Sequence, residues 1–307
     1  MLLPQRLDAG DKVAVVAIAS PAQSLRDIHD ALELISSSNL SVHIPERRLM
    51  WSANKTQYLA GPDWVRVSEL NKALSDPTVR AIVCLRGGYG SMRVLRAVNY
   101  RSVAADPKPV VGFSDITALL TALYTKCGLV TYHGPVLTTI KRHVSEEDKA
   151  SARMFVNAVF GRILEDDLWA LTESAESRVK VIKHGQASGV LLGGNLSMMC
   201  SLLGTPYMPN FNGCLLFLEE VKEPLYRIDR MLTQLELAGV FRKVCGVVLC
   251  DFTGCPGAVD RLIRRRLLEL NGPAIYGVSA GHGSRNFTLM VGHPYVIDTQ
   301  AQIFRPA

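Results

Sequence analysis

The chain has 307 residues, of which 48% are hydrophobic and 20% are charged, with a formal net charge of +6. These values are typical of a globular protein with two domains, because single cores rarely grow beyond about 250–300 residues. The densest basic run, RLIRRRLLEL at 261–270, has the spacing of a solvated helix face, so we do not expect a nucleic-acid partner.

Cysteines and hydropathy indicate the compartment. The seven cysteines lie in or beside apolar runs and show no CxxC pair, which predicts free thiols and no metal site. Residues 187–218 carry no charge, but GGN, GTPYMPN and FNG interrupt them, so no apolar stretch of about 20 residues remains. The start of the sequence lacks the features of a signal peptide. We therefore expect a cytoplasmic protein with no membrane segment.

The first half of the sequence alternates between strands and helices. Strands are predicted at 12–19, 41–44, 79–85 and 109–113, and helices at 24–38, 61–77, 91–99 and 115–128. This alternation predicts a parallel sheet with helices on both faces. We assign residues 1–165 to an α/β domain of the doubly wound, flavodoxin-like or amidotransferase-like kind.

The pattern changes after a predicted helix at 145–161. Residues 166–180 are polar and are interpreted as a linker. From 181 to 307, shorter strands are interrupted by three helices, at 194–204, 224–238 and 257–270. This half is predicted to be a mixed α/β domain with a small barrel-like sheet.

A glycine-rich loop follows the strand at 79–85. Ligands of parallel α/β sheets bind at the carboxyl ends of strands, so RGGYG at 86–90 is a candidate. It matches neither GxGxxG nor GK[ST], and we expect no nucleotide cofactor. Such a loop is either a tight turn or a source of backbone N–H groups for an oxyanion.

Ser114 and Asp115 stand where an apolar strand meets a helix, in PVVGFSDITALLTALY at 109–124. One interpretation is an N-cap, in which a side-chain oxygen accepts from the first helical N–H groups. The other is a nucleophile on a tight strand-to-helix turn.

A serine nucleophile requires a base, and the base requires an acid. His282 lies between two glycines in AGHGSRN, after a predicted strand, and is the candidate base. Glu219 and Glu220 close an apolar run, where a carboxylate is costly without a partner. The order Ser114, Glu219, His282 is the nucleophile–acid–base order of α/β-hydrolases.

Several motifs along nearly the whole chain resemble those of one family. They are VAIASPA, the 58–90 segment ending in RGGYG, VVGFSDITAL, YHGP, LLGGNLSMMCSLLGTPYMP, LFLEEVKEPLYRIDRMLTQLELAGVF and GHGSRNFTLMVG. In this order they resemble the LD-carboxypeptidases, serine peptidases that act on murein tetrapeptides. The resemblance implies a homodimer that releases D-alanine from a muropeptide in cell-wall recycling.

The resemblance also implies residue roles. Ser114 would be the nucleophile, Glu219 the acid and His282 the base, with the N–H groups of Gly88 and Asp115 as the oxyanion hole. No metal is implied.

A terminal carboxylate suits an arginine partner, although a surface ion pair is the more ordinary use of an arginine. The substrate-binding candidates are Arg86, Tyr89, Arg93, Arg227 and Arg285.

The sequence departs from the family pattern at three places. Glu220 stands where Asp is frequent, Ser284-Arg285 where Asp-Pro is frequent, and Met290 where Pro is frequent. Two alternatives stay open: the microcin-immunity branch of the family, which cleaves a different amide or carboxamide bond, and a non-catalytic small-molecule binding module.

Overall fold

A computed structural model describes residues 1–24, 26–44, 58–140, 146–162, 164–173, 179–267 and 270–307. The chain forms two compact units. The N-terminal unit contains residues 1–164 and 288–290, and the C-terminal unit contains residues 165–287 and 291–307.

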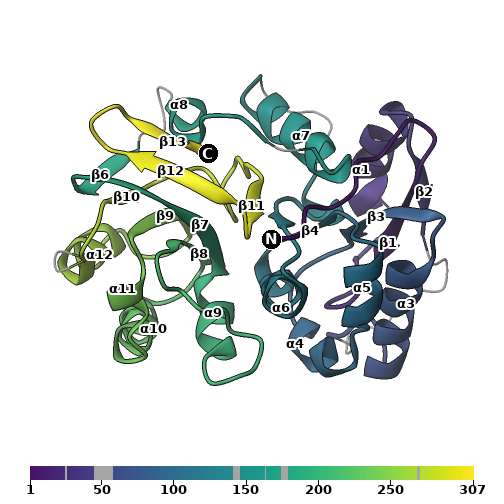
Figure 1. Ribbon diagram of the computed structural model, residues 1–307, viewed down its shortest axis with the longest axis horizontal. Helices are drawn as coiled ribbons and strands as arrows, with labels where there is room; N and C mark the ends of the chain where they lie inside the picture. Colours follow the sequence, from purple (N-terminus) through teal and green to yellow (C-terminus); the bar gives the residue numbers. More distant parts are fainter. Residues whose placement is uncertain (25, 45–57, 141–145, 163, 174–178, 268–269) are drawn as a thin grey trace. The chain divides into compact units, whose positions relative to one another are not determined.

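The N-terminal unit is built on a six-stranded sheet (Figure 1). In spatial order its strands are β11 (Leu289–Val291), β5 (Thr131–His133), β4 (Val110–Gly112), β3 (Val79–Cys84), β1 (Lys12–Val16) and β2 (Ser41–His43). The pairings from β2 through β5 are parallel. The order 2-1-3-4-5 is that of flavodoxin-like sheets, whose ligand site lies where β1 and β3 diverge. The predicted doubly wound fold is confirmed.

Helices pack on both faces of this sheet, which explains why its strands are apolar on both sides. One face carries α1 (Arg26–Ser37) and α7 (Glu146–Val159), and the other carries α3 (Asp63–Ser75), α4 (Ser91–Val94), α5 (Tyr100–Ala105) and α6 (Thr117–Cys127). Three 3₁₀ turns are η2 (Leu95–Ala97), η3 (Ser114–Ile116) and η4 (Leu137–Thr139).

The helix expected at 91–99 differs from the structure. It breaks into α4 and the turn η2, and α5 then begins after Asn99, whose side chain accepts from the Ser102 N–H. An Asn cap favours a new helix start over a continuous helix.

The C-terminal unit contains a seven-stranded mixed sheet. In spatial order its strands are β13 (Ile303–Pro306), β12 (Pro294–Asp298), β7 (Gln186–Asn195), β8 (Leu215–Val221), β9 (Gly246–Thr253), β10 (Ala274–Tyr276) and β6 (Lys180–Lys183). Strands β7 to β10 are parallel, whereas the outer pairings are antiparallel. The sheet curls, as Figure 1 shows, and the expected mixed α/β, barrel-like architecture is confirmed.

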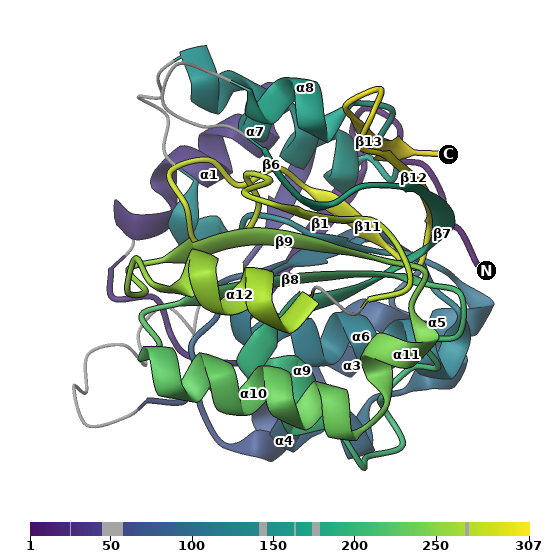
Figure 2. The ribbon, with the colours of Figure 1, turned by 90° about the vertical axis from the view of Figure 1, so that its left-hand side faces the viewer.

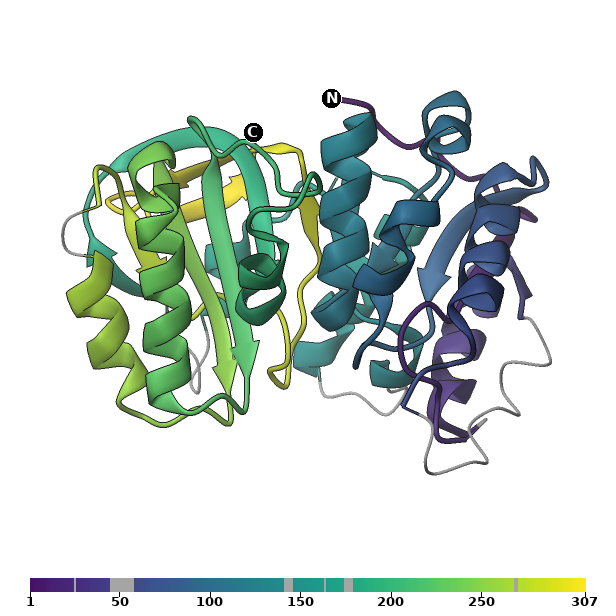
Figure 3. The same ribbon diagram turned by 90° about the horizontal axis from the view of Figure 1, so that it is seen from below.

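Helices α9 (Leu196–Leu202), α10 (Leu225–Leu237) and α12 (Val259–Leu267) lie along this sheet (Figure 2). Helix α10 packs against both of the others and lies between them (Figure 1). Figure 3 shows α10 running beside the long strands β8 and β9. The short helix α11 (Val240–Lys243) follows α10.

Part of the segment interpreted as a linker is helical. Helix α8 (Leu168–Thr172) buries Trp169, while residues 174–178 lie outside the described residues. Residue 145 and residues 268–269, expected to be helical, also lie outside them.

Among the described residues, no helix combines the length and the hydropathy needed to cross a membrane.

Candidate active site

Ser114 lies on a tight turn between β4 and α6. Its φ of 63° is in the left-handed region, which residues other than glycine rarely adopt. Phe113 occupies the N-cap of η3 and is extended, so Ser114 is not the N-cap residue. A strained strand-to-helix turn of this kind presents a side chain at the end of the sheet, as nucleophile elbows do.

Gly87 packs directly against Ser114, a role that sequence analysis missed. A Cβ at Gly87 would lie 2.8 Å from the Ser114 Cβ and 3.0 Å from its Oγ. Only glycine allows this approach without a shift of the loop. Gly87 is the first glycine of the RGGYG motif, but the sequence does not indicate which of the two adjacent glycines contacts Ser114.

Ser20 positions the glycine loop from the neighbouring end of β1. Its Oγ accepts from the Tyr89 N–H at 3.2 Å and donates to the Tyr58 carbonyl at 2.7 Å. Gly88 has a φ of 103°, and a Cβ there would lie 2.3 Å from Ser20 Oγ. In the described part of the chain, the Gly88 N–H makes no hydrogen bond and is available to an oxyanion.

The Asp115 side chain does not cap its own helix, as the N-cap interpretation would require. Its Oδ2 accepts from the Ser91 N–H at 2.8 Å, and Ser91 Oγ donates to the Asp115 carbonyl at 2.5 Å. The carboxylate therefore anchors the start of α4. The Asp115 N–H belongs to the first turn of η3, where amides lack intrahelical acceptors.

Arg86 and Tyr89 lie in the same loop. Arg86 is half-buried, and its Nη1 donates to the Pro21 carbonyl at 3.0 Å. Tyr89 is exposed, with its ring centroid 5.8 Å from that of Tyr58. Arg93 is instead committed to Asp63, with an Nη2–Oδ2 distance of 2.8 Å.

The C-terminal unit contains a histidine–carboxylate pair. His282 Nδ1 lies 2.7 Å from Glu219 Oε2, joining the loop after β10 to strand β8. An ionised carboxylate can only accept, so it holds the proton on Nδ1 and leaves Nε2 as the acceptor nitrogen. This is the orientation that a general base requires.

Burial dominates the electrostatics of Glu219, whose side chain is fully enclosed. Desolvation raises the pKa of the Glu219 carboxyl, and the hydrogen bond from His282 opposes that rise. Gly281, with a φ of 109°, makes the close approach possible, because a Cβ there would lie 2.6 Å from Glu219 Oε2.

Glu220 has different partners from Glu219. Its Oε2 accepts from Ser197 N at 2.9 Å and from Ser197 Oγ at 2.7 Å, and its Oε1 accepts from Asn195 Nδ2 at 3.0 Å. Glu220 thus anchors the start of α9. Successive side chains of a strand point to opposite faces, which explains the division.

Asp251 carries a half-buried carboxyl that sequence analysis did not single out. It follows the apolar run VVLC on β9, next to β8. Desolvation, followed by the nearby charge of Glu219, raises its pKa to about 7. The sequence pattern that could have identified Asp251 is the one that identified Glu219, an acidic residue directly after an apolar run.

The two remaining arginine candidates have partners of their own. Arg285 is 7% exposed, and its Nη1 donates to the Leu171 carbonyl at 3.3 Å. Arg227 forms a surface ion pair with Glu223 at 3.1 Å.

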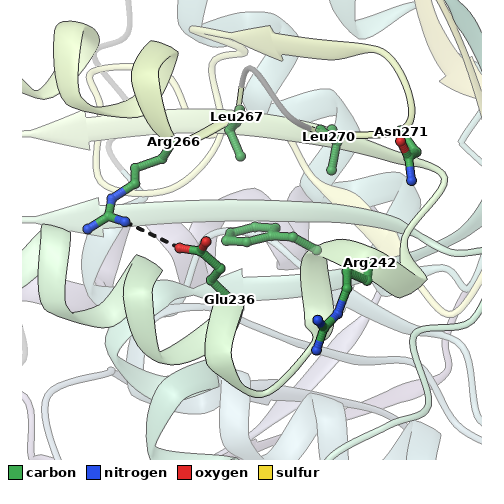
Figure 4. A pocket seen from close by; sticks show the side chains of 7 residues that line it. Glu236, Arg242, Arg266, Leu267, Leu270 and Asn271 are labelled. Carbon is green, nitrogen blue, oxygen red and sulfur yellow. Dashed lines mark hydrogen bonds and ion pairs between the residues drawn. The ribbon is translucent and has the colours of Figure 1, made fainter.

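Other clusters are less suited to catalysis. A pocket of about 220 Å³ is shown in Figure 4; it contains the Arg266–Glu236 ion pair and none of the candidate residues. His29, Asp30 and Glu33 could place three ligand atoms within 4.8 Å of one another. They lie on the partly exposed side of α1, where such groups are common without a metal.

Comparison with known proteins agrees with the fold and shows the family. The model of the LD-carboxypeptidase N-terminal domain matches residues 13–134, and that of the C-terminal domain matches residues 188–297. The protein is thus a peptidase-type hydrolase by class. The chain belongs to the LD-carboxypeptidase family.

Relatives carry related names. The chain is 31% identical to the "Probable murein peptide carboxypeptidase" of Bacillus subtilis, covering 96% of this chain and 91% of that protein. It is 31% identical to the murein tetrapeptide carboxypeptidase of Pseudomonas aeruginosa, covering 92% of each. The microcin C7 self-immunity protein MccF of Escherichia coli is 26% identical over 78% of this chain and 77% of its own length.

Among solved structures, an MccF-like protein from Bacillus anthracis matches with a TM-score of 0.84 and 27% identity, covering 99% of this chain and 98% of that one.

Proposed function

We propose that this protein is a serine carboxypeptidase that cleaves an L,D-peptide bond and releases the C-terminal D-alanine of a murein tetrapeptide. The observation that carries the proposal is the 2.7 Å contact between His282 Nδ1 and Glu219 Oε2. A buried carboxylate that orients an imidazole is the acid–base half of a hydrolytic triad. The strained Ser114 turn supplies the nucleophile half.

In the proposed first step, His282 Nε2 takes the proton of Ser114 Oγ as Oγ bonds to the substrate carbonyl carbon. The carbonyl oxygen becomes an oxyanion that accepts from the Gly88 and Asp115 N–H groups. The C–N bond then breaks, and imidazolium returns the proton to the leaving amine. Glu219 stabilises the imidazolium throughout.

In the second step, water replaces the amine. His282 takes a proton from water as the water oxygen attacks the carbonyl carbon of the acyl-enzyme. The ester bond then breaks, and His282 passes the proton to Ser114 Oγ. The products are D-alanine and the shortened peptide.

Arg86 is the arginine best placed to receive the terminal carboxylate. It adjoins Gly87, which packs on Ser114, and only its Nη1 has a partner among the described residues. Its planar guanidinium retains donors for a bidentate carboxylate contact.

The test is incubation with murein tetrapeptide and detection of free D-alanine by mass spectrometry. A serine-directed reagent is expected to add one adduct, on Ser114. Release of D-alanine by wild-type protein and none by Ser114→Ala supports the proposal. Intact peptide together with an unlabelled serine would favour a non-catalytic binding module.

The likeness to MccF favours one alternative, hydrolysis of an amide or carboxamide bond of the microcin type. Both activities would use the same nucleophile, so substrates distinguish them. Cleavage of an aminoacyl amide of microcin type, with the tetrapeptide untouched, would assign the chain to that branch.

We also propose a cytoplasmic homodimer. Sedimentation equilibrium tests the assembly, with a mass twice the 33.6 kDa of the chain as the expected result.

A further inference from the structure

Asp251 contacts the loop that carries His282 through both its main chain and its side chain. Its N–H donates to the Ala280 carbonyl at 3.2 Å, and its carboxylate accepts from the Gly283 N–H. A Cβ at Gly283 would lie only 2.3 Å from Asp251 Oδ2, so the loop lies directly on this carboxyl. The loop is therefore attached on either side of His282.

Two buried carboxyl oxygens in this cluster lack hydrogen-bond partners among the described residues. They are Glu219 Oε1 and Asp251 Oδ2. The Asn195 amide donates to Glu220 Oε1 at 3.0 Å, and its hydrogen bonding to Glu219 lowers the pKa of that carboxyl less than His282 does. On β8 and β9, Leu218 pairs with Leu249 and Glu220 with Phe252, so the irregular stretch of β9 opposite Glu219 contains Asp251. The charge of Glu219 acts on Asp251, and a single proton would satisfy both oxygens.

We propose that Asp251 is a positioning residue: it anchors the His282 loop through Gly283 and, as a carboxylic acid, donates Oδ2–H to Glu219 Oε1. This proposal rests on the proposed function, because it assigns Asp251 to the same acid–base pair. Asp251 acts through Glu219 and His282 and does not touch substrate.

The groups around Asp251 favour retention of this proton. Glu219 faces it from β8, Tyr276 lies nearby on β10, Cys250 adjoins it on β9, and the loop brings His282 and Arg285. Burial and Glu219 raise the Asp251 pKa to about 7, while Arg285 and His282 oppose the rise. The acid form therefore predominates below neutrality and is lost as pH rises above about 7.

The sharpest test is the pH profile of kcat in wild type and Asp251→Asn. Asparagine accepts from Gly283 and donates to Glu219 at every pH, so it mimics the protonated acid. We expect wild-type kcat to fall at least threefold between pH 7 and 9, and this decline to be absent in Asp251→Asn. An equal decline in both, or none in wild type, would overturn the proposal.

Asp260→Asn is the matched control, since it removes the same charge from an aspartate of α12 that is ion-paired with Lys180 and Arg264. Its pH profile should follow the wild type. A profile altered as in Asp251→Asn would attribute the effect to overall charge and contradict the proposal.

A second measurement needs no substrate and so separates this inference from the proposed function. The downfield ¹H NMR signal of His282 Nδ1–H, assigned by its loss in His282→Gln, should persist in Asp251→Asn. In Asp251→Leu it should move upfield or disappear, with faster amide exchange at Gly283. An unchanged signal and exchange in folded Asp251→Leu would show that Asp251 does not position the loop, whatever substrate the enzyme takes.

Discussion

At the scale of single residues, Ser114 combines a strained backbone with the proposed nucleophile. A side chain in the left-handed region costs roughly 1–2 kcal/mol, a cost that glycine avoids. Its φ of 63° therefore predicts that Ser114→Gly raises the free energy of unfolding by about 1 kcal/mol while abolishing turnover. Urea unfolding and D-alanine release measure the two effects.

Ser114→Ala is the companion variant, because alanine keeps the strain and removes only the hydroxyl. It should also lose turnover, with stability close to wild type. More than a few per cent of wild-type activity in Ser114→Ala would exclude covalent catalysis through this residue.

Glu219 and Glu220 provide a matched pair of substitutions on one strand. Glu219→Gln weakens the orientation of His282 and should lower kcat by about 10²–10⁴-fold, the range seen when a triad acid is replaced. Glu220→Gln retains an acceptor for Ser197 at the start of α9, so kcat should fall less than about tenfold. Steady-state kinetics at neutral pH give kcat for both variants. A larger loss in Glu220→Gln than in Glu219→Gln would assign the role of triad acid to Glu220.

Asp251 makes stability depend on pH. Its native pKa of about 7 exceeds the ordinary 3.8, so between these values the native state binds more protons than the unfolded state. The free energy of unfolding therefore falls as pH rises from about 4 to about 7. Asp251→Asn has no carboxyl to ionise at this position, so it does not share this loss. The free energy of unfolding of Asp251→Asn, relative to wild type, should rise between pH 4 and 8 by up to about 4 kcal/mol. A pH-independent difference in urea unfolding would contradict this.

At the scale of elements, α3 fixes the loops around the candidate nucleophile through one buried side chain. Arg66 is 1% exposed and donates to the carbonyls of Ile18, Gly61 and Gly90. Its removal takes this donor from the Ile18 and Gly61 carbonyls, at about 1–3 kcal/mol each, whereas the Gly90 carbonyl still accepts from the Arg93 N–H.

We therefore expect Arg66→Leu to lower the free energy of unfolding by about 3 kcal/mol or more. Arg93→Leu is the control, because Arg93 binds the same Asp63 but is exposed. That variant should unfold at nearly the wild-type urea concentration. Similar losses in both would attribute the effect to Asp63 rather than to the carbonyls.

At the scale of the whole molecule, the N-terminal unit is completed by residues from the end of the chain. Strand β11 lies beside β5, and Met290 Sδ accepts from Leu164 N at 3.5 Å. Without β11, the buried strand β5 would become an edge strand with unpaired backbone groups.

A fragment of residues 1–164 should therefore show faster amide exchange in β5 than the full chain does. Addition of a peptide of residues 286–292 should restore part of the protection. Protection in the fragment equal to that in the full chain would show that β11 adds nothing to the stability of this unit.

The sequence alone determined the fold class and most of the elements, because these depend on local patterns. Strands β1, β3 and β4 are apolar on both sides, and apolar periodicity marks α1 and α10. Chain order and loop chemistry were likewise sufficient to propose Ser114, Glu219 and His282. Glu219 and His282 are 63 residues apart, and this spacing does not predict how close they lie. In the structure, His282 Nδ1 lies 2.7 Å from Glu219 Oε2.

Only the tertiary structure decided which neighbouring groups act together. Contacts such as Gly87 on Ser114, Ser20 on the glycine loop, Asp115 on Ser91 and Asp251 on Gly283 join residues from different strands and loops. Their partners are set by strand order and by the paths of loops, which depend on packing across the whole sheet rather than on adjacent residues. Burial has the same origin: whether a carboxyl such as Asp251 keeps its proton depends on the chain folded around it.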